Sequence, residues 1–404
     1  MADLRDYEVF SRVGLQADRT TTATGSGGGA WVDIAINKDG MQLNSNKVTT
    51  TIDTEHRFRG PAYTFFTQRN SESGTISTPL YPNMMGTLMN GVFALDGNGD
   101  LNYHTWEFYW DASLTGGDDA IRYKGVIFDG VSFTIDRNTE GSVITADFTA
   151  YVNSKEVVSA TVPTFTRSAL DPYVAADAVF DFVGDSTTFL GGDNPDVLSV
   201  SVTYQNNTEL KAFLSNSTAI LNKTWTRQYV GEVSAQITVE LLVSNDDYLK
   251  YDEGASTTVG AIRMAVRHPV TGATDTTTAD IAAADSSATE TYTTAGSATF
   301  SAGDIIYAYD ADNNRFCTLP VVSHSGTTLT IDRATYSSYV DVEGSGATAV
   351  TLEDRCWGLV VPSMNLLSST PPTSNGNVRT VTLNYEATIT AGQTAVVVPM
   401  FANM

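Results

Sequence analysis

The segment from Asp96 to Asp100 (DGNGD) spaces three oxygen-bearing side chains at alternate positions, which is how a calcium-binding loop begins. Glu107 falls at position twelve, where such a loop places a bidentate carboxylate. Leu101, however, occupies position six, at which the sharp turn of the loop needs glycine. The pattern therefore favours a turn built on Asp and Gly over a calcium site.

Two further segments match ligand-binding loops only in part. Asp310 to Asn314 repeats the alternate oxygens, but Arg315 takes the glycine position and no glutamate closes the loop, which favours a hairpin tip. The run from Gly25 to Gly29 lacks the Gly-Lys-Ser/Thr ending of a phosphate loop, and no helix is predicted after it. We interpret this run as a flexible segment before a strand that starts near Trp31.

Glu107 also lies in an aromatic run, from Trp106 to Trp110 (WEFYW). Such a run could form a sugar-binding platform, with the acid as half of a carboxylate pair. At the two-residue period of a strand, Trp106, Phe108 and Trp110 share one face, and a core face is the better interpretation.

Nucleophiles and metal ligands show no productive spacing. No Gly-x-Ser-x-Gly elbow lies between a strand and a helix, and the four histidines are scattered. Cys317 and Cys356 could form a bridge, but two buried free thiols are the favoured interpretation. We therefore expect no catalytic, cofactor-binding or metal-binding residue, and we predict that the chain is not an enzyme.

The chain of 404 residues carries 46 acidic and 23 basic side chains, for a formal net charge of −23. A protein that grips nucleic acid by neutralising phosphates needs clustered Lys and Arg, and the sequence has no such cluster. The charge therefore excludes that class of protein. Because the N-terminus is polar and no long apolar run occurs, we expect no signal peptide and no membrane anchor.

Alternating apolar and polar residues recur along the whole chain and predict a mainly β fold. Residues 31–37, 199–204, 233–243 and 378–389 are typical strands. Helix signals are few. Asn83 to Leu95 has apolar residues at helical spacing and follows a proline, and Asn245 to Lys250 predicts a short turn of helix.

A weak internal repeat organises these elements. In the first copy, a strand at Gly74 is followed by the helix and by strands that begin at Gly125 and Gly141. In the second copy, corresponding segments begin at Gly231, Gly358 and Gly376, with 76 additional residues before Gly358.

The repeat and the additional residues predict three modules. The first is a β-sandwich over residues 1–165, and the second is a β-sandwich formed by residues 166–272 and 353–404. Each sandwich carries a short helix. Residues 273–352 form an inserted small β module, because an Ala/Thr/Ser/Asp-rich segment leads into short alternating strands.

The stretch from Gly74 to Leu95, followed by the strand that begins at Tyr123 (YKGVIFDGVSFTI) and a Gly-led return strand, resembles bacteriophage tail tube proteins. Residues 196–204, 224–243 and 362–387 repeat the pattern. The inserted module lies outside it.

The resemblance implies a structural virion protein that self-assembles into stacked rings around a channel for DNA. Three copies of a duplicated chain would form a homotrimeric, pseudo-hexameric ring. The implied partners are other copies, other tail proteins and viral DNA that passes without specific binding, in a virion tail made in the host cytoplasm. The inserted module is expected to face outward, because a channel has no room for it.

In such tubes a long loop between the first strands reaches the adjacent ring. That loop matches about residues 38–60 in the first half and 205–223 in the second. Arg57 and Arg59 interrupt an otherwise acidic chain there, so we predict that they form an inter-ring contact. The alternatives are another virion or surface structural protein, such as a capsid decoration protein or an adhesin, and a glycan-active enzyme.

Overall fold

The computed structural model is mainly β, as predicted: of the residues that it describes, 70% are in strands and 6% in helices. It describes the following residues: 8–15, 31–37, 40–54, 62–109, 118–137, 142–160, 171–183, 196–211, 227–242, 259–270, 272–278, 289–310, 315–332, 350–370, 373–375, 378–389 and 395–401.

The first part of the chain forms eight strands and a short helical segment. The strands are β1 (Glu8–Leu15), β2 (Val32–Asn37), β3 (Met41–Thr54), β4 (Ala62–Pro79), β5 (His104–Tyr109), β6 (Asp118–Asp136), β7 (Thr145–Val152) and β8 (Ser154–Ala160). The helical segment is continuous through α1 (Pro82–Met84), η2 (Met85–Met89) and α2 (Asn90–Phe93).

The second part contains ten strands and a 3₁₀ turn, η3 (Ala175–Asp177). The strands are β9 (Ala178–Val183), β10 (Asp196–Gln205), β11 (Glu209–Lys211), β12 (Arg227–Tyr229), β13 (Ser234–Leu242), β14 (Val259–Arg267), β21 (Cys356–Ser369), β22 (Thr373–Asn375), β23 (Val378–Ala387) and β24 (Val398–Met400). The helix predicted at residues 245–250 lies outside the described residues.

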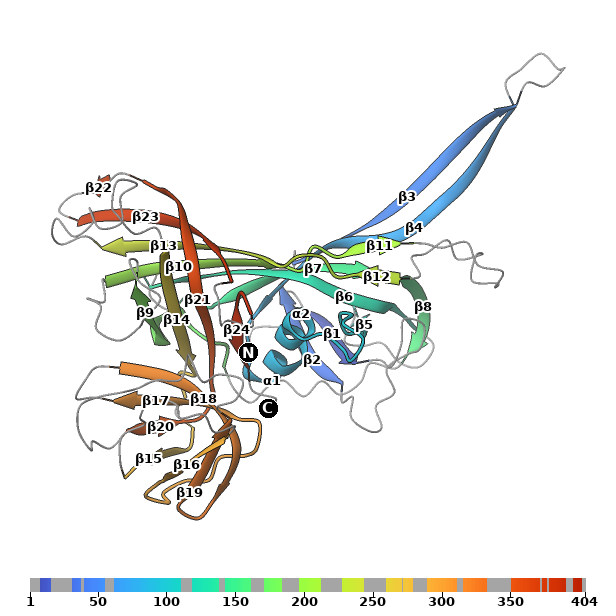
Figure 1. Ribbon diagram of the computed structural model, residues 1–404. Coiled ribbons are helices and arrows are strands. Elements are labelled where there is room, and N and C mark those ends of the chain that lie inside the picture. Colours follow the sequence, from blue (N-terminus) through green and yellow to red (C-terminus); the bar gives the residue numbers. More distant parts are fainter. Residues whose placement is uncertain are drawn as a thin grey trace.

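Eight antiparallel strands form the main layer, in the order β3-β4-β7-β6-β10-β13-β23-β21. This layer crosses the upper part of Figure 1, and the β3–β4 hairpin projects beyond it. The pairing of β6 with β10 joins the two parts of the chain, so the layer runs without a break across the boundary predicted near residue 165.

Long strands connect this layer to a second one. The first half of β6 pairs with β5 and β8 in a sheet that continues to β1 and β2. Gly125 has a φ of 61°, a left-handed conformation that glycine adopts freely, near the point where β6 passes between layers. Similarly, the first half of β21 pairs with β14 and β24, and β14 pairs with β9.

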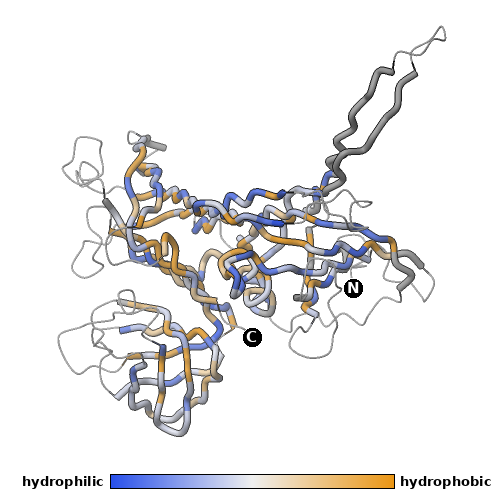
Figure 2. Tube along the Cα trace, turned by 45° about the vertical axis from the view of Figure 1, so that its right-hand side comes forward, coloured by the Kyte–Doolittle hydropathy of each residue, from blue (hydrophilic) through white to orange (hydrophobic). Residues whose placement is uncertain are grey.

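A single apolar core fills the space between the layers. It includes Leu88 and Met89 of the helical segment, Trp106 of β5, Val202 of β10 and Trp357 of β21, all fully buried. Hydrophilic and hydrophobic residues alternate along the strands in Figure 2, as expected for sheets with one face in this core. The predicted helix at residues 83–95 is confirmed, with Pro82 at its first position.

A separate six-stranded sheet lies below the main body in Figure 1. The apolar cluster on which it packs is distinct from the main core. The strand order of this sheet is β15 (Thr274–Thr276), β20 (Thr351–Glu353), β17 (Ile305–Asp310), β18 (Arg315–Ser325), β19 (Thr328–Asp332) and β16 (Thr289–Thr293). Its core is shared with Ala265 of β14 and Val360 of β21, which face away from the main core. The six-stranded sheet therefore packs against the outer side of the second layer.

Candidate functional site

The face of the eight-stranded layer that points away from the core is polar from strand to strand. In one cross-strand row, the hydroxyls of Thr134 (β6) and Ser201 (β10) lie 2.8 Å apart. Ser201 lies opposite Thr238 on β13, whose hydroxyl donates to the amide oxygen of Asn384 on β23 at 2.9 Å. The Asn384 amide donates in turn to Ser368 on β21 at 3.0 Å. Neighbouring strands thus present a connected row of hydroxyl and amide groups.

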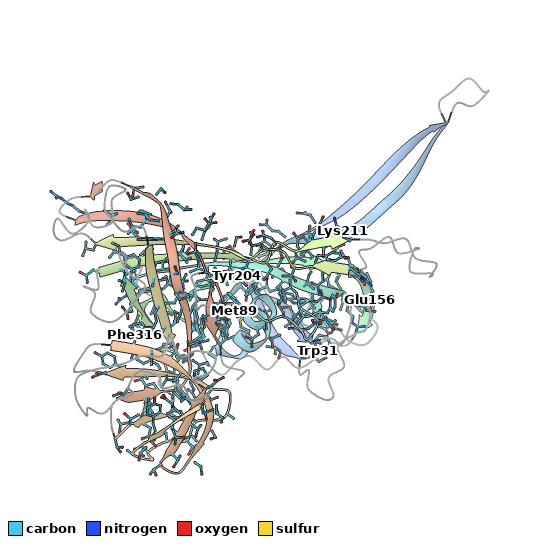
Figure 3. All side chains as sticks on the ribbon, in the orientation of Figure 1. Trp31, Met89, Glu156, Tyr204, Lys211 and Phe316 are labelled. Carbon is cyan, nitrogen blue, oxygen red and sulfur yellow. The ribbon has the colours of Figure 1, made fainter. Side chains whose placement is uncertain are left out.

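The charged residues described on this outward face are all acidic. They alternate along their strands with residues that face the core, and they are Asp136, Asp147, Asp196, Glu240 and Glu386. Within this layer, no Lys or Arg occupies such a position among the residues whose side chains the structure describes. Arg122 and Lys124 lie in the first half of β6, which pairs with β8 and belongs to the second layer. Tyr204 and Met89, on the opposite side of the layer, lie within the body of the protein (Figure 3).

The layer ends at β3 on one side, and β3 pairs with β4 alone among the described strands. The Ser77 N–H donates to the Gly40 carbonyl at 2.6 Å, which marks a hydrogen-bonded pair. Because such pairs alternate with unbonded ones along an antiparallel ladder, Gln42 and Asn44 bond to β4. The backbone groups of Leu43 and Ser45 therefore face away from β4, toward the open edge.

The other end of the layer is the last part of β21. The Thr370 N–H donates to the Thr382 carbonyl at 2.9 Å, so Ser368 also belongs to a bonded pair with β23. The backbone groups of Ser369 consequently point away from β23. Among the described strands, β14 pairs with this side of β21 only as far as Asn365, and none covers β3 on the side away from β4. Within the part of the chain that the structure describes, each end of the layer thus offers peptide groups to a further strand.

The predicted site residues Arg57 and Arg59 lie between β3 and β4, outside the described residues. The expectation of a loop over residues 38–60 is wrong for its larger part, because β3 extends to Thr54 and pairs with β4 from Met41 onward. The loop was expected only from the resemblance to tail tube proteins, and the pairing of β3 with β4 corrects that expectation.

The Asp96 segment forms a turn, as favoured from the sequence. One carboxylate oxygen of Asp96 accepts hydrogen bonds from the backbone N–H groups of Asn98 at 2.7 Å and Asp100 at 3.0 Å. Both hydrogen bonds lower the pKa of Asp96, with the one from Asp100 contributing most. The described residues include no group of three or more His, Cys, Asp or Glu that could hold a metal ion.

Trp106 and Phe108 stack with ring centroids 5.3 Å apart in the main core, which confirms the core-face interpretation; Trp110 lies outside the described residues. Glu107 occupies the other face of β5 and is 1% exposed. Cys317 and Cys356 are both free and buried, as favoured from the sequence.

Glu107 is the centre of a cross-strand row of charges that the sequence did not reveal. From β2 to β8 the directly opposed residues are Asp33, Arg12, Glu107, Arg122 and Glu156, so the sign alternates across five strands. The Glu107 carboxylate accepts from the Arg12 Nε at 2.7 Å and from the Arg122 Nε at 2.6 Å. No motif predicts this row, because its members come from distant parts of the sequence.

Hydrogen bonds and neighbouring charges set the ionisation of this row. Burial acts to raise the pKa of Glu107, but the hydroxyl of Tyr109, which donates at 2.5 Å, and the guanidinium groups of Arg12 and Arg122 outweigh it and lower the pKa. Burial and the nearby carboxylate raise the pKa of Tyr109. Glu107 is therefore held ionised and fully paired, which suits a structural role rather than proton transfer.

No model of a known protein family matches the chain, and no curated protein matches it. We therefore infer a function from the surfaces described above. None of the helices in the described ranges has the length and apolar character needed to cross a membrane.

Proposed function

We propose that this chain is a structural protein of the bacteriophage tail-tube type, whose copies join through the edges of the eight-stranded layer into rings that stack into a tube. The observation that carries the proposal is a pair of edges that no described strand covers: the backbone groups of Ser45 on β3 and Ser369 on β21 point away from the layer within the plane of the sheet. An open edge is a template for another strand, and closure into a ring leaves no edge exposed.

The order of pairing supports this mode of assembly. The layer divides into two sets of four strands, β3-β4-β7-β6 and β10-β13-β23-β21. Each set ends on a long strand with a bulge, between Phe128 and Gly130 in β6 and between Leu366 and Ser368 in β21. β6 and β21 are the last strands of their sets, and β10 and β3 are the first. If the sets are equivalent, β21 pairs with β3 of the next copy in the same way as β6 pairs with β10 within the chain. Three copies then make a homotrimeric, pseudo-hexameric ring.

This equivalence specifies the register of the contact. Matching the two bulges places Ser369 where Val131 stands on β6, and it places Ser45 where Tyr204 stands on β10. Val131 and Tyr204 are directly opposite in the β6–β10 pairing. Ser369 should therefore lie opposite Ser45 of the next copy.

The outward face of the layer suits the wall of a channel for DNA. Its hydroxyls, amides and acids include the row from Thr134 to Ser368, and the described positions carry no cation to hold a phosphate. The six-stranded sheet packs on the far side of the second layer, so it would lie on the outside of a tube. DNA would then pass in a virion tail, with other tail proteins at the ends of the tube.

The test removes edge hydrogen bonds without touching the core. Ser45→Pro deletes an N–H that points away from β4, so the monomer should keep its melting temperature but fail to form rings. Asn44→Pro deletes an N–H that bonds to β4 and should lower the melting temperature. Ser45→Thr retains the N–H and is the matched control, which should still assemble. Rings formed by Ser45→Pro at the level of the unaltered chain would contradict the proposed edge contact.

Arg57 and Arg59 remain a prediction for the ring-to-ring contact. Reversing both charges to Glu should shorten tubes or reduce their yield, measured by electron microscopy, and unchanged tubes would refute the assignment.

A further inference from the structure

We infer that the two corresponding hairpins of this chain have different tasks: β11–β12 is fixed to the chain's own first half, whereas β3–β4 is the arm that reaches a copy in the adjacent ring. Ring-to-ring contacts would then occur three times per ring of three chains, although the ring itself is pseudo-sixfold. This inference rests on the proposed function and specifies how its rings stack.

The hairpins occupy the same place in the two sets of strands. β3 and β4 are the first two strands of one set, and β10 and β13 are the first two of the other. β11 and β12 continue β10 and β13 beyond the layer, after interruptions at residues 206–208 and 230–233. The β3–β4 hairpin has only a register shift between Val48 and Thr49 and continues to Thr54 opposite Ala62.

A bend after β10 turns the second hairpin toward the first half of the chain. Asn207 adopts a φ of 51°, and the preceding Asn206 is 2% exposed. The Asn206 side-chain amide donates to the Val92 carbonyl at 2.8 Å and to the Asp129 carbonyl at 3.1 Å. The bend is therefore attached both to the helical segment and to β6.

Asp129 is the bulged residue of β6 and completes this attachment. Its backbone carbonyl accepts from the Asn206 N–H at 2.7 Å, and its carboxylate accepts from the Thr208 N–H at 2.8 Å. The carboxylate thus satisfies a buried N–H that would otherwise lack an acceptor. The bulge that ends one set of strands is in this way the anchor of the next hairpin.

Contacts farther along the second hairpin hold it in place. The Gln228 side-chain amide of β12 donates to the Leu101 carbonyl at 2.7 Å. Leu101 and Ile127 form a small buried cluster, against which Leu210 of β11 and Val230 pack. The β11–β12 hairpin is therefore part of the protein body, and it is seen alongside β6 in Figure 1.

The bulge that would receive β3–β4 of the next copy lacks this anchor. Leu367 stands at the bulge of β21 and is 53% exposed, so it offers no carboxylate to a bent strand. β3 also has no left-handed residue among its described positions. The first hairpin accordingly continues in the direction of its strands and leaves the body (Figure 1).

The direction of the arm follows from edge-to-edge closure. In a ring closed through strand edges, hydrogen bonds run around the circumference and strands run obliquely along the axis. A hairpin that continues its strands beyond the layer must therefore leave the plane of the ring. The nearest occupant in that direction is another copy of this chain in the next ring.

Two hairpin deletions test this division of tasks. Asn46 and Ser71 are directly opposite and, by the alternation described above, form a hydrogen-bonded pair, as a two-residue turn requires. Residues 47–70 can therefore be replaced by an Asn-Gly turn that leaves the edge at Ser45 intact. Lys211 and Arg227 are likewise opposite, so residues 212–226 can be replaced by the same turn as the matched variant. Each variant keeps the rest of the chain and is purified, and its rings and tubes are counted by electron microscopy.

The first deletion should give single rings that do not stack, and the second should give tubes of ordinary length with three bridges between successive rings. Rings from the first variant also establish that it folds. Tubes from the first variant, loss of stacking in the second, or six bridges per ring contact would overturn the inference. Failure of the unaltered chain to form rings would instead overturn the proposed function, and this inference with it.

Discussion

Thr134 on β6 and Ser201 on β10 lie directly opposite each other, with their hydroxyl oxygens 2.8 Å apart. They belong to the pairing that joins the two parts of the chain into one layer. Similar polar pairs, such as Thr238 with Asn384, lie on strands farther along the layer. The β6–β10 pairing that joins the two parts therefore resembles the other strand pairings of the layer. The proposed pairing of β21 with β3 of the next copy would be of the same kind.

Cysteine cross-linking tests the register of the contact between copies. With Ser45→Cys and Ser369→Cys in one chain, opposed residues of a bonded antiparallel pair would lie about 5.5 Å apart at Cα, within disulfide range. Oxidation should give covalent dimers and trimers on a non-reducing gel, and no larger species. Asn44→Cys with Ser369→Cys is the control, because that cysteine points to the other face. Bands extending beyond the trimer would contradict a closed ring of three.

Lysine on the outward face tests the channel wall. Thr203 and Gln236 are exposed and directly opposite on β10 and β13. Replacing both by Lys should make tubes retain DNA at low salt and release it as salt rises, because counterion release drives such binding. Lysines at Ser323 and Thr291 of the six-stranded sheet are the control, and they should leave DNA unbound inside the tube. Retention of DNA by tubes of the unaltered chain would contradict the proposal that the channel wall does not bind DNA.

Asp129→Leu tests the anchor of the second hairpin by giving β6 the residue that β21 carries at its bulge. The Thr208 N–H loses its acceptor while Thr208 stays buried, which should cost about 1–3 kcal/mol in the free energy of unfolding. Urea unfolding measures the loss, and proteolysis should become faster within residues 209–229. Asp129→Asn retains an accepting oxygen and should lose much less. Equal losses for the two variants would show that the hydrogen bond to Thr208 is unimportant.

Glu107 should make stability depend on acid pH. Its pKa is lowered in the folded protein, so its contribution is complete above the ordinary Glu pKa and is lost as the pH falls through the lowered value. Glu107→Gln should therefore destabilise the protein at pH 7 and have a smaller effect near pH 3. Glu156→Gln is the control, because its side chain is 36% exposed and its pairs should contribute under about 1 kcal/mol. A pH-independent cost for Glu107→Gln would exclude this role.

The sequence was sufficient for those features that depend on local pattern. Alternation predicted the β composition, and Pro82 with the apolar spacing after it predicted the helical segment. The two-residue period also placed Trp106 and Phe108 in the core. Each of these signals lies within a single element, so no long-range information was needed.

Features that combine distant segments were not predictable in this way. The charge row around Glu107 joins five strands, and its partners cannot be read from the WEFYW run. The attachment of Asn206 to Asp129 spans the two halves of the chain and gives no local signal. The repeat predicted from glycine spacing aligns Gly125 with Gly358, whereas the proposed equivalence of the two sets of strands aligns the bulges at Asp129 and Leu367. Glycine spacing does not locate a bulge, because a bulge depends on the register with the partner strand.

Electron microscopy of the purified, unaltered chain tests the central claim most directly. The proposal predicts closed rings with three chains each, which stack into tubes as the protein concentration rises. Rings should show six similar outlines around the channel, with three six-stranded modules on the outside. Monodisperse monomers that persist at high concentration, with no rings or tubes, would contradict the account.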